Sequence, residues 1–533
     1  MDCRAFEPHQ LPHTSKLFCD YAESFSKVKA FYEHPPGLKA TVHYAKKLEF
    51  PAERRASVAE ILREQNTRFG GGAETQKNLD RLRDGAFAVV SGQQVGLFGG
   101  PAFSFYKALS AIETARELTE KGVDAVPMFW MATEDHDVDE VRRVHWFHEG
   151  ELLEFALPKP AEDAVPVGQI RLGPEVHELV VRAQPLLGQT YGDLLHETYI
   201  PAATYTSAFA GMFARIFAEQ GLILLDPLDE RLHRVAAPFL RDALAKRDEL
   251  NDLLLDRGKE LERAGYEVQV KVTTQSTLLF SMIDGKREVI GAKNAEFSSG
   301  GRTMAREEWL RRVEESPQQF SPNALLRPVM QDFLLPTIAY FGGPAEIAYF
   351  AQSQVLYENL LGRMPVLFPR ADFTLVDPKA QRILKKYGLD VKDVWRGPQE
   401  LQKRMYNSAV PMKLSRQFDE NLEQVEKSMK KLHKAIAKVD PTIQGAIARA
   451  EKRIQYQVEK LRHKTGAALD RHDKVIEKHL TFLENLLFPE KGLQSRALCF
   501  LPFLGRGGSG TLQQLQNLAG AKKAGRHCVV EIA

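Results

Sequence analysis

The chain has 533 residues, and its 72 Lys+Arg against 70 Asp+Glu leave a net charge of only +2. Hydrophobic residues make up 44% and charged residues 27%, a composition typical of a folded globular protein with about two to four domains. The near-zero charge excludes a general electrostatic attraction to nucleic acid or to a membrane surface. No apolar run reaches the roughly 18 residues that cross a bilayer, so we expect no membrane partner.

The four cysteines and the N-terminus bear on the cellular compartment. Cys3, Cys19, Cys499 and Cys528 are too few and too scattered to predict a disulfide framework or a zinc knuckle. The first ten residues have no apolar core like that of a signal peptide. We therefore expect the chain to be reduced and cytoplasmic.

The first 132 residues predict helices followed by a βαβ unit. Residues 1 to about 85 are amphipathic, with helices at 57–66 and 74–83 that Gly70–Gly72 separates. The short apolar runs 87–90 and 126–132 predict buried strands, and 103–121 between them predicts a helix. Because βαβ units are right-handed and parallel, the loops after both strands open on the same edge of the sheet, where ligands bind in open α/β folds.

The loop after the first strand, 91–101, is rich in glycine and amides. Its glycines allow close approach of a ligand, and the helix N-terminus at Phe103 favours an anion. It matches neither the dinucleotide nor the P-loop pattern, so the pattern gives no nucleotide site, and a structural turn is the alternative. The candidate substrate-binding residues here are Ser91, Gln93, Gln94, Gly99, Gly100 and Tyr106.

The second loop carries a dense acidic cluster around one histidine. Glu134, Asp135, His136 and Asp137 follow the strand directly and are our candidate catalytic residues, able to bind Mg²⁺, act as a base or hold an amine. Asp139 and Glu140 suit the solvated first turn of a helix instead. Zinc binding by His136, His145 and His148 lacks the spacing of a known zinc motif, and we assign no metal site.

The middle of the chain adds further strands and a third glycine-rich loop. Residues 150–200 read as an insertion, 221–227 as a buried strand, and 267–273 with 277–283 as a β pair that Val289 and Ile290 extend. Gly343 and Glu346 lie in the third loop, and Arg370 ends a strand at 365–370. Arg370 suits a substrate carboxylate, although a packing role for these three residues is equally compatible with the sequence.

From about residue 376 the pattern becomes helical. Apolar residues spaced four and three apart over 418–439 form a heptad seam, and a second apolar stripe runs over 443–487. We predict a long antiparallel hairpin that serves as a dimerisation arm. Residues 413–478 carry 16 Lys+Arg against 10 Asp+Glu, so RNA binding is the alternative, but Phe418 and Tyr456 are too few to interleave with the basic residues for base stacking. Residues 413–416 are only faintly similar to the K-M-S-K-S loop of class I aminoacyl-tRNA synthetases.

The predicted fold class is α/β, a Rossmann-like parallel-sheet core with insertions followed by a long antiparallel coiled-coil arm. The predicted domains are a core at 1–375, with insertions at about 150–215 and 240–330, an arm at 376–489 and a capping tail at 490–533.

Two motifs carry a resemblance to a known family. The run V-S-G-Q-Q-x-G-L-F-x-G-P at 90–101, followed by P-x-F-W-x-A-x-E-D-H-D-x-D-E at 127–140, resembles the bacillithiol biosynthesis cysteine-adding enzymes. The block 342–349 and the coiled coil are similar to the same family, so the resemblance covers nearly the whole chain. It implies a core related to class I nucleotidyl transferases, with connecting-peptide insertions and a coiled-coil dimer arm.

The resemblance also implies an activity. Members of the family are proposed to join L-cysteine to glucosaminyl-malate in the last step of bacillithiol biosynthesis, and an adenine nucleotide is associated with them away from the core cleft. We therefore expect an amide-forming ligase that uses ATP and yields ADP or a related product, with Mg²⁺ as a further candidate. Gln93, Gln94, Gly99 and Gly100 would bind the malate carboxylates, and His136 with Asp135 or Asp137 would handle the amine proton.

Two other functions compete with this one. A synthetase-like RNA-binding protein would use the basic arm and bind RNA in a salt-sensitive way. A non-catalytic dimeric scaffold would have a vestigial cleft. The missing H-I-G-H motif argues against the first and the acids at the strand ends against the second, so we expect small-molecule substrates, a homodimer and no nucleic-acid partner.

Overall fold

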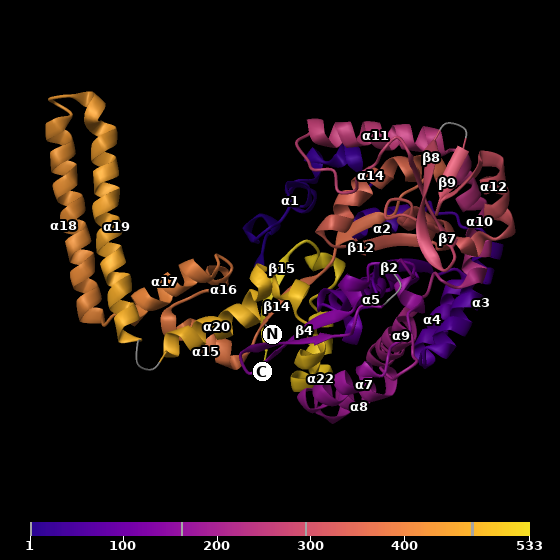
Figure 1. Ribbon diagram of the computed structural model, residues 1–533, viewed down its shortest axis with the longest axis horizontal. Helices are drawn as coiled ribbons and strands as arrows, with labels where there is room; N and C mark the ends of the chain where they lie inside the picture. The colour runs from indigo at the N-terminus through magenta and orange to yellow at the C-terminus, as the bar shows by residue number, and fades with distance from the viewer. Residues whose placement is uncertain (1–2, 161–163, 294–295, 471–473, 533) are drawn as a thin grey trace. The chain divides into compact units, whose positions relative to one another are not determined.

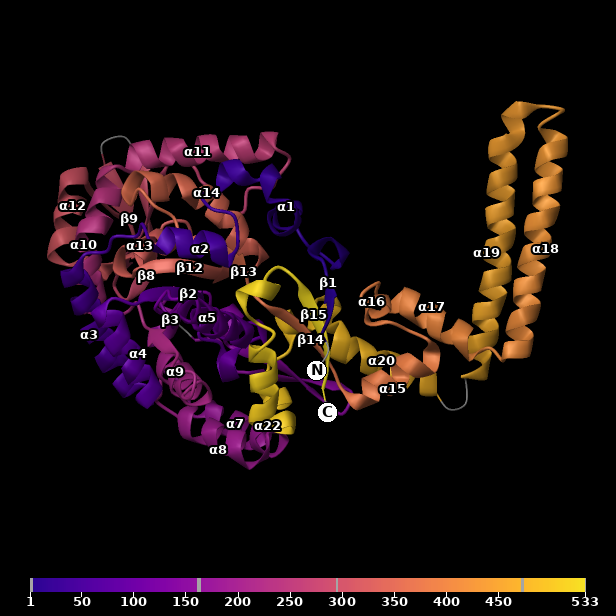
Figure 2. The same cartoon turned by 180° about the vertical axis from the view of Figure 1, so that it is seen from behind.

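Figures 1 and 2 show the computed structural model of the chain, which describes residues 3–160, 164–293, 296–470 and 474–532. Positions 1 and 533, where the predicted first and last domains begin and end, lie outside this range. The chain divides into two compact units: Met1–His148, Leu153–Thr374 and Ser495–Val530 form the first, and Glu149–Leu152, Leu375–Gln494 and Glu531–Ala533 the second. None of the described helices is long and apolar enough to cross a membrane.

The first unit is built on a five-stranded parallel sheet with the order β13-β12-β2-β3-β6. Counted along the chain, these strands follow the order 3-2-1-4-5 of the dinucleotide-binding fold, so the predicted Rossmann-like core is confirmed. The order reverses between β2 and β12, which makes the carboxyl ends of these two strands the topological switch point. The strands are β2 (Phe87–Gln93), β3 (Ala125–Met131), β6 (Ile223–Leu225), β12 (Thr337–Gly342) and β13 (Val366–Pro369).

Each strand buries both of its faces, as the continuous apolar runs predict. Val89 packs on the side of α5 (Phe103–Glu120) and α2 (Leu38–Ala45). Its neighbours Ala88 and Val90 face the opposite core, which α3 (Ala52–Arg68), α10 (Glu230–Ala245) and α14 (Pro344–Leu360) complete. Alternation with period two therefore places helices on both faces of the sheet.

Strand β2 is longer than predicted. The sequence predicted a strand at 87–90 and a loop from Ser91, but β2 pairs with β3 as far as Gln93 opposite Met131. A side chain at position 92 would lie 2.5 Å from the Trp130 carbonyl oxygen, so only glycine lets the strands approach there. Gln93 is therefore the last residue of a paired strand and does not lie in a loop.

A second sheet of five antiparallel strands, β10-β9-β8-β7-β11, lies in the same unit. The predicted strand at 267–273 is wrong, because the Val270 amide and carbonyl bond the side-chain amide of Gln352, at 2.9 and 2.8 Å, and not a neighbouring strand. Val289 and Ile290 do join the sheet, as predicted. Its strands are β7 (Ser276–Ile283), β8 (Lys286–Lys293), β9 (Glu296–Ser299), β10 (Arg302–Ala305) and β11 (Phe320–Pro322).

A third sheet, β1-β15-β14, brings the two ends of the chain together. Cys3 of β1 (Cys3–Phe6) forms a disulfide with Cys528 of β15 (His527–Glu531) across 525 residues of sequence. The expectation of a reduced chain is therefore wrong for these two cysteines, because only the fold makes their strands neighbours. The third strand is β14 (Asp372–Val376).

Further elements complete the first unit. The helices before the central sheet confirm the predicted breaks, since α3 ends before Gly70 and α4 begins after Gly72. The predicted insertion at 150–200 is largely helical. These elements are α1 (Lys16–Glu23), α4 (Ala73–Asp84), α6 (Val138–Val141), β4 (Arg143–His148), β5 (Glu151–Ala156), α7 (Glu175–Ala183), α8 (Gly188–Thr198), α9 (Tyr205–Ile216), α11 (Arg247–Arg263), α12 (Arg306–Glu315), α13 (Arg327–Leu334), α21 (Gln494–Ala497) and α22 (Leu501–Gln516).

The second unit carries the coiled-coil hairpin. Helices α18 (Met412–Ile436) and α19 (Gln444–Leu469) lie side by side in both views and pack on each other. Met429 and Ile447 are buried, but Leu432, Val439 and Leu461 of the same stripes are about half or more exposed. The homodimer through this hairpin stays a prediction. The other helices of the unit are α15 (Pro378–Tyr387), α16 (Val391–Val394), α17 (Pro398–Ala409) and α20 (Val475–Leu487).

Candidate functional site

A cavity of about 610 Å³ lies at the switch point of the central sheet, within the first unit. The ends of β2, β3 and β12 form its floor, and residues of the antiparallel sheet and of α13 close it. Ligands bind at this position in open α/β sheets because the strand ends leave a crevice there. The predicted site residues that line the cavity are Gln93, Gln94, Glu134, Asp135, His136, Gly343, Glu346 and Arg370.

Five other predicted site residues do not line this cavity. Ser91 is buried and donates to the Phe341 carbonyl at 2.8 Å. Tyr106 is buried with its ring 4.9 Å from that of Phe373. Asp137 is exposed and caps the short helix α6 through the Glu140 amide. Gly99 and Gly100 are also buried away from it, so none of these five side chains or backbones faces a ligand there.

The glycine-rich loop after β2 is a packing device. Gly99 has a φ of 90°, and a Cβ at this position would lie 2.7 Å from the Phe105 ring, so glycine is required by strain and by space. The amides of Gly99, Gly100 and Ala102 donate to the carbonyls of Gly96, Leu97 and Leu498. Because these N–H groups are used within the protein, the loop does not fit a phosphate cradle.

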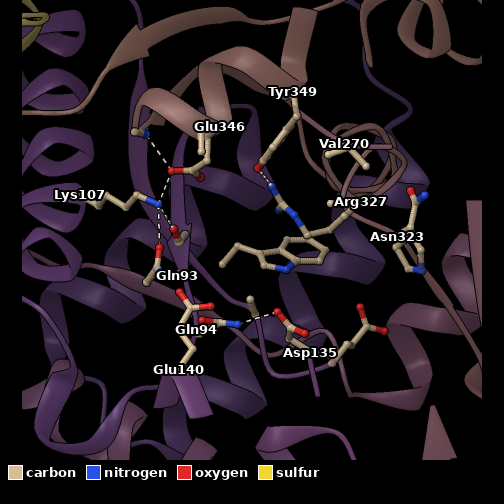
Figure 3. Close-up of a pocket in the computed structure, with 18 of the residues that line it drawn as sticks. Gln93, Gln94, Lys107, Asp135, Glu140, Val270, Asn323, Arg327, Glu346 and Tyr349 are labelled. Atoms are coloured by element: carbon tan, nitrogen blue, oxygen red, sulfur yellow. Dashed lines mark hydrogen bonds and ion pairs between the residues drawn. The ribbon is translucent and has the colours of Figure 1, made fainter. Parts of the chain in front are cut away.

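A buried ion pair stands on one side of the cavity. Lys107 of α5, which is 2% exposed, pairs with Glu346 and donates to the Gly92 carbonyl at 2.8 Å (Figure 3). Glu346 also accepts from the Gly343 amide and the Tyr340 hydroxyl, each at 2.7 Å. Burial alone would raise the pKa of Glu346, but the Lys107 charge and the Gly343 amide lower it. The pair therefore ties the ends of β2 and β12 together.

The two glutamines after β2 present opposite chemistry to the cavity. Lys107 donates to Gln93 Oε1 at 2.9 Å, so the Gln93 amide nitrogen is the group that can donate to a ligand. Gln94 is turned the other way, since its Nε2 donates to Asp135 at 2.6 Å. Gln94 Oε1 and Trp130 Nε1 are buried without a hydrogen-bond partner among the described residues. A ligand that donates to Gln94 and accepts from Trp130 would satisfy both.

The acidic loop places carboxylates beside His136, and the contacts of this histidine restrict its role. Arg287 Nη1 lies 3.2 Å from His136 Nδ1. A guanidinium can only donate, so Nδ1 accepts and the ring proton is on Nε2. In this arrangement His136 can donate to a ligand but cannot act as a base. Glu140 is exposed in the first turn of α6, as predicted, and it also lines the cavity, where partial desolvation and the charge of Asp135 raise its pKa.

Three arginines that sequence reasoning missed line the cavity. Arg327 donates to the hydroxyls of Tyr340 and Tyr349 at 3.3 and 3.4 Å, and no carboxylate of the described residues lies within ion-pair distance of it (Figure 3). Arg287 and Arg496 line the same cavity. Arg327 was open to detection, because it is a lone charge within the apolar run 325–330. The positions of Arg287 and Arg496 had no such signal.

Arg370, which directly follows β13, is held by a buried acid. Its Nη1 donates to Asp372 Oδ1 at 2.6 Å, and Asp372 Oδ2 lies 2.9 Å from His527 Nδ1. Burial alone would raise the pKa of Asp372, but Arg370 and His527 hold it well below its usual range. Asp372 therefore positions Arg370 at the edge of the cavity.

The low pKa of Asp372 predicts an acid-dependent loss of stability. A carboxyl whose folded pKa lies below its unfolded value of about 3.9 stabilises the fold above that pH, and this contribution is lost as the pH falls through the folded pKa. Asp372→Asn should cost roughly 1.5–3 kcal/mol near pH 7, where a charged hydrogen bond is lost. The difference between the melting temperatures of the two proteins should be constant from pH 7 to about pH 4 and should narrow below that pH, and a difference that stays constant down to about pH 2 would contradict the assignment.

Within the part of the chain that the structure describes, no three His, Cys, Asp or Glu side chains are grouped so that they could hold a metal ion. His136, His145 and His148 are accordingly not brought together.

Comparison with known proteins covers the whole chain. The sequence model of one protein family, "Bacillithiol biosynthesis BshC, N-terminal Rossmann-like domain", matches residues 2–371. A second family model, "Bacillithiol biosynthesis BshC, C-terminal coiled-coil domain", matches residues 373–532. Relatives named "Putative cysteine ligase BshC" are 42% identical in Koribacter versatilis, over 96% of each chain, and 38% identical in Solibacter usitatus, over 95% of this chain and 96% of the relative. A third, in Chlorobaculum tepidum, is 32% identical over 97% of each chain. The resemblance seen in the two motifs is thereby confirmed, and the chain belongs to the BshC family of bacillithiol biosynthesis.

Proposed function

We propose that this protein is an ATP-dependent, amide-forming ligase that joins the carboxylate of L-cysteine to the amine of glucosaminyl-malate, the last step of bacillithiol biosynthesis. Family membership and the printed name of the relatives support a cysteine ligase. The cavity at the switch point supports a site for a polar, anionic small molecule.

The observation that carries the proposal is the guanidinium of Arg327. It faces the cavity, it is held by two tyrosine hydroxyls, and among the described residues it has no carboxylate. Both Nη2 hydrogens go to the tyrosines and one Nη1 hydrogen to Gln331 Oε1 at 3.1 Å, so Nε and the second Nη1 hydrogen are left to donate to a ligand carboxylate. Arg496 also lines the cavity, so two guanidinium groups are available for the two carboxylates of a malate moiety.

The amine end of the substrate fits the part of the cavity around Gln94. Gln94 Oε1 can accept a hydrogen bond from the amine, and Asp135 and Glu140 lie beside it. When the amine attacks the activated carboxyl carbon, the new C–N bond forms, the bond from that carbon to its phosphate-type leaving group breaks, and the amine loses a proton to one of these carboxylates. His136 presents its Nε2 proton and would stabilise the oxygen that gains negative charge.

Activation of the cysteine carboxylate is the step for which we propose ATP. A free carboxylate does not react with an amine, and a phosphate-type leaving group on the carboxyl carbon supplies the missing driving force. The glycine-rich loop does not fit the phosphates, since its amides bond the protein itself. We therefore assign the nucleotide no residues in that loop, and neither ATP nor Mg²⁺ enters the steps described for the chain's own residues.

The first test is a thiol profile of cells with and without the gene, by labelling and mass spectrometry. Loss of bacillithiol with accumulation of glucosaminyl-malate is expected, and unchanged pools would refute the function. Complementation with Gln94→Ala should leave bacillithiol reduced at least tenfold, because the amine loses its acceptor in the cavity. Gln76→Ala, which removes a surface amide on α4, should restore wild-type levels. Full restoration by Gln94→Ala would place the amine elsewhere.

A further inference from the structure

A second, smaller cavity of about 100 Å³ adjoins the large one. Two residues, Glu134 and Arg287, line both cavities and so form their common wall. The remaining lining includes Leu228, Met282 and Gln318. Nothing in the steps described so far uses this space, although charged side chains are buried in its wall.

The common wall holds opposite charges in fixed positions. Glu134 is 6% exposed, and its Oε1 lies 3.2 Å from Nε2 of His233, which is 4% exposed. Burial by itself lowers the pKa of His233, but the hydrogen bond to Glu134 and its charge leave that pKa raised. His233 therefore holds the Glu134 carboxylate in place at the common wall.

Arg287 is held just as firmly and still has donors to spare. Its Nε donates to Ser321 Oγ at 2.9 Å and its Nη2 to the Pro322 carbonyl at 2.8 Å, while Nη1 reaches His136. Its guanidinium carbon Cζ lies over the Phe280 ring, 3.8 Å from the ring centroid. A guanidinium has five N–H donors, so two of them remain for a ligand at the common wall.

The size of the small cavity limits what it can hold. A water-sized position takes roughly 10–15 Å³ of such space, so 100 Å³ accepts a molecule of about seven to ten non-hydrogen atoms. This excludes a nucleotide or an amino sugar and admits a small free amino acid. Leu228 and Met282 supply an apolar, sulfur-containing patch that suits a thiol side chain.

We propose that the small cavity binds the amino-acid substrate, with the carboxylate of a small thiol-bearing α-amino acid on Arg287 and its ammonium group on Glu134. The proposal rests on the proposed function, because it names the place of the cysteine in that reaction. The carboxyl carbon then stands at the common wall, facing the large cavity that holds the amine. Two anchored substrates meeting at one wall would make the amide-forming step intramolecular in effect.

The test uses titration calorimetry on the full-length protein, with L-cysteine and L-malate as separate probes. Gln318→Trp fills the small cavity from a half-buried position that does not line the large one. It should weaken cysteine binding at least tenfold and change malate binding less than threefold. Gln319→Trp, at the exposed neighbouring position outside both cavities, is the matched control and should change neither.

Two ligand analogues test the assigned charges. Cysteamine lacks the carboxylate and 3-mercaptopropionate lacks the amine, so each should bind the wild-type protein at least tenfold more weakly than cysteine. Wild-type cysteine affinity in a folded Gln318→Trp protein, equal loss of cysteine and malate binding in it, or no cysteine binding to the wild-type protein at millimolar concentration would each overturn the proposal. Failure of the ligase function itself would show instead as unchanged thiol pools in cells without the gene.

Discussion

Lys107→Met should lower the free energy of unfolding by about 3–5 kcal/mol, the cost of leaving a buried charge without its partner. Lys107 is 2% exposed, and its ammonium group is the cation that faces Glu346. Without it, the Glu346 carboxylate must stay buried with only the Gly343 amide and the Tyr340 hydroxyl, or take up a proton. Urea unfolding followed by circular dichroism measures the loss.

Two comparisons separate this effect from simple loss of packing. Lys107→Met combined with Glu346→Gln removes both charges and should recover part of the stability, because no unpaired carboxylate remains. In the single variant the loss should also shrink as the pH approaches the ordinary glutamate pKa of about 4.3, since protonation then removes the buried charge. An additive double variant and a pH-independent loss would show that the pair is not coupled.

Arg327→Met should weaken L-malate binding by about 2–5 kcal/mol, which is roughly thirtyfold or more. The methionine keeps much of the apolar stem but removes the guanidinium that we assign to the substrate carboxylate. Titration calorimetry with malate measures the change, and thiol profiling of complemented cells should show a matching loss of bacillithiol. Cysteine binding should persist, because Arg327 does not line the small cavity.

The control for Arg327 is an arginine of the same unit that the cavity does not use. Arg311 is exposed and pairs with Glu308 at 2.6 Å on the surface of α12, so Arg311→Met should leave malate binding unchanged. Arg327→Lys keeps the charge but loses the planar set of donors that bonds Tyr340, Tyr349 and the ligand together, and we expect intermediate binding. Equal malate affinity in wild-type and Arg327→Met proteins would move the carboxylate site to another part of the cavity.

The charged groups that line the cavity have different roles. The Lys107–Glu346 pair is neutralised within the protein, so its role is to fix the ends of β2 and β12 and to orient Gln93. Arg370 is likewise neutralised by Asp372. Arg327 is not neutralised by a described carboxylate, which is why substrate recognition is assigned to it and not to the arginine that the sequence singled out.

The sequence by itself determined the elements whose signal is local. The apolar runs before residues 91 and 133 predict buried parallel strands, because a strand that is buried on both faces is apolar throughout. The heptad spacing over 418–439 predicts the hairpin helix, because a helix that is buried along one stripe has apolar residues at a regular spacing. The loop at 134–136 was placed correctly at a strand end for the same reason. The motifs at 90–101 and 127–140 were enough to identify the family.

The tertiary structure decided everything that depends on partners far along the chain. Arg287 and Arg327 reach the cavity from an antiparallel sheet and a helix more than 130 residues after Gln94, so no spacing rule links them. The glycine-rich loop looked like an anion site until its amides were seen to bond carbonyls of the protein, among them Leu498 from the end of the chain. Cys3 and Cys528 pair for the same reason: local sequence encodes the strands, but only the assembled fold determines which strands become neighbours.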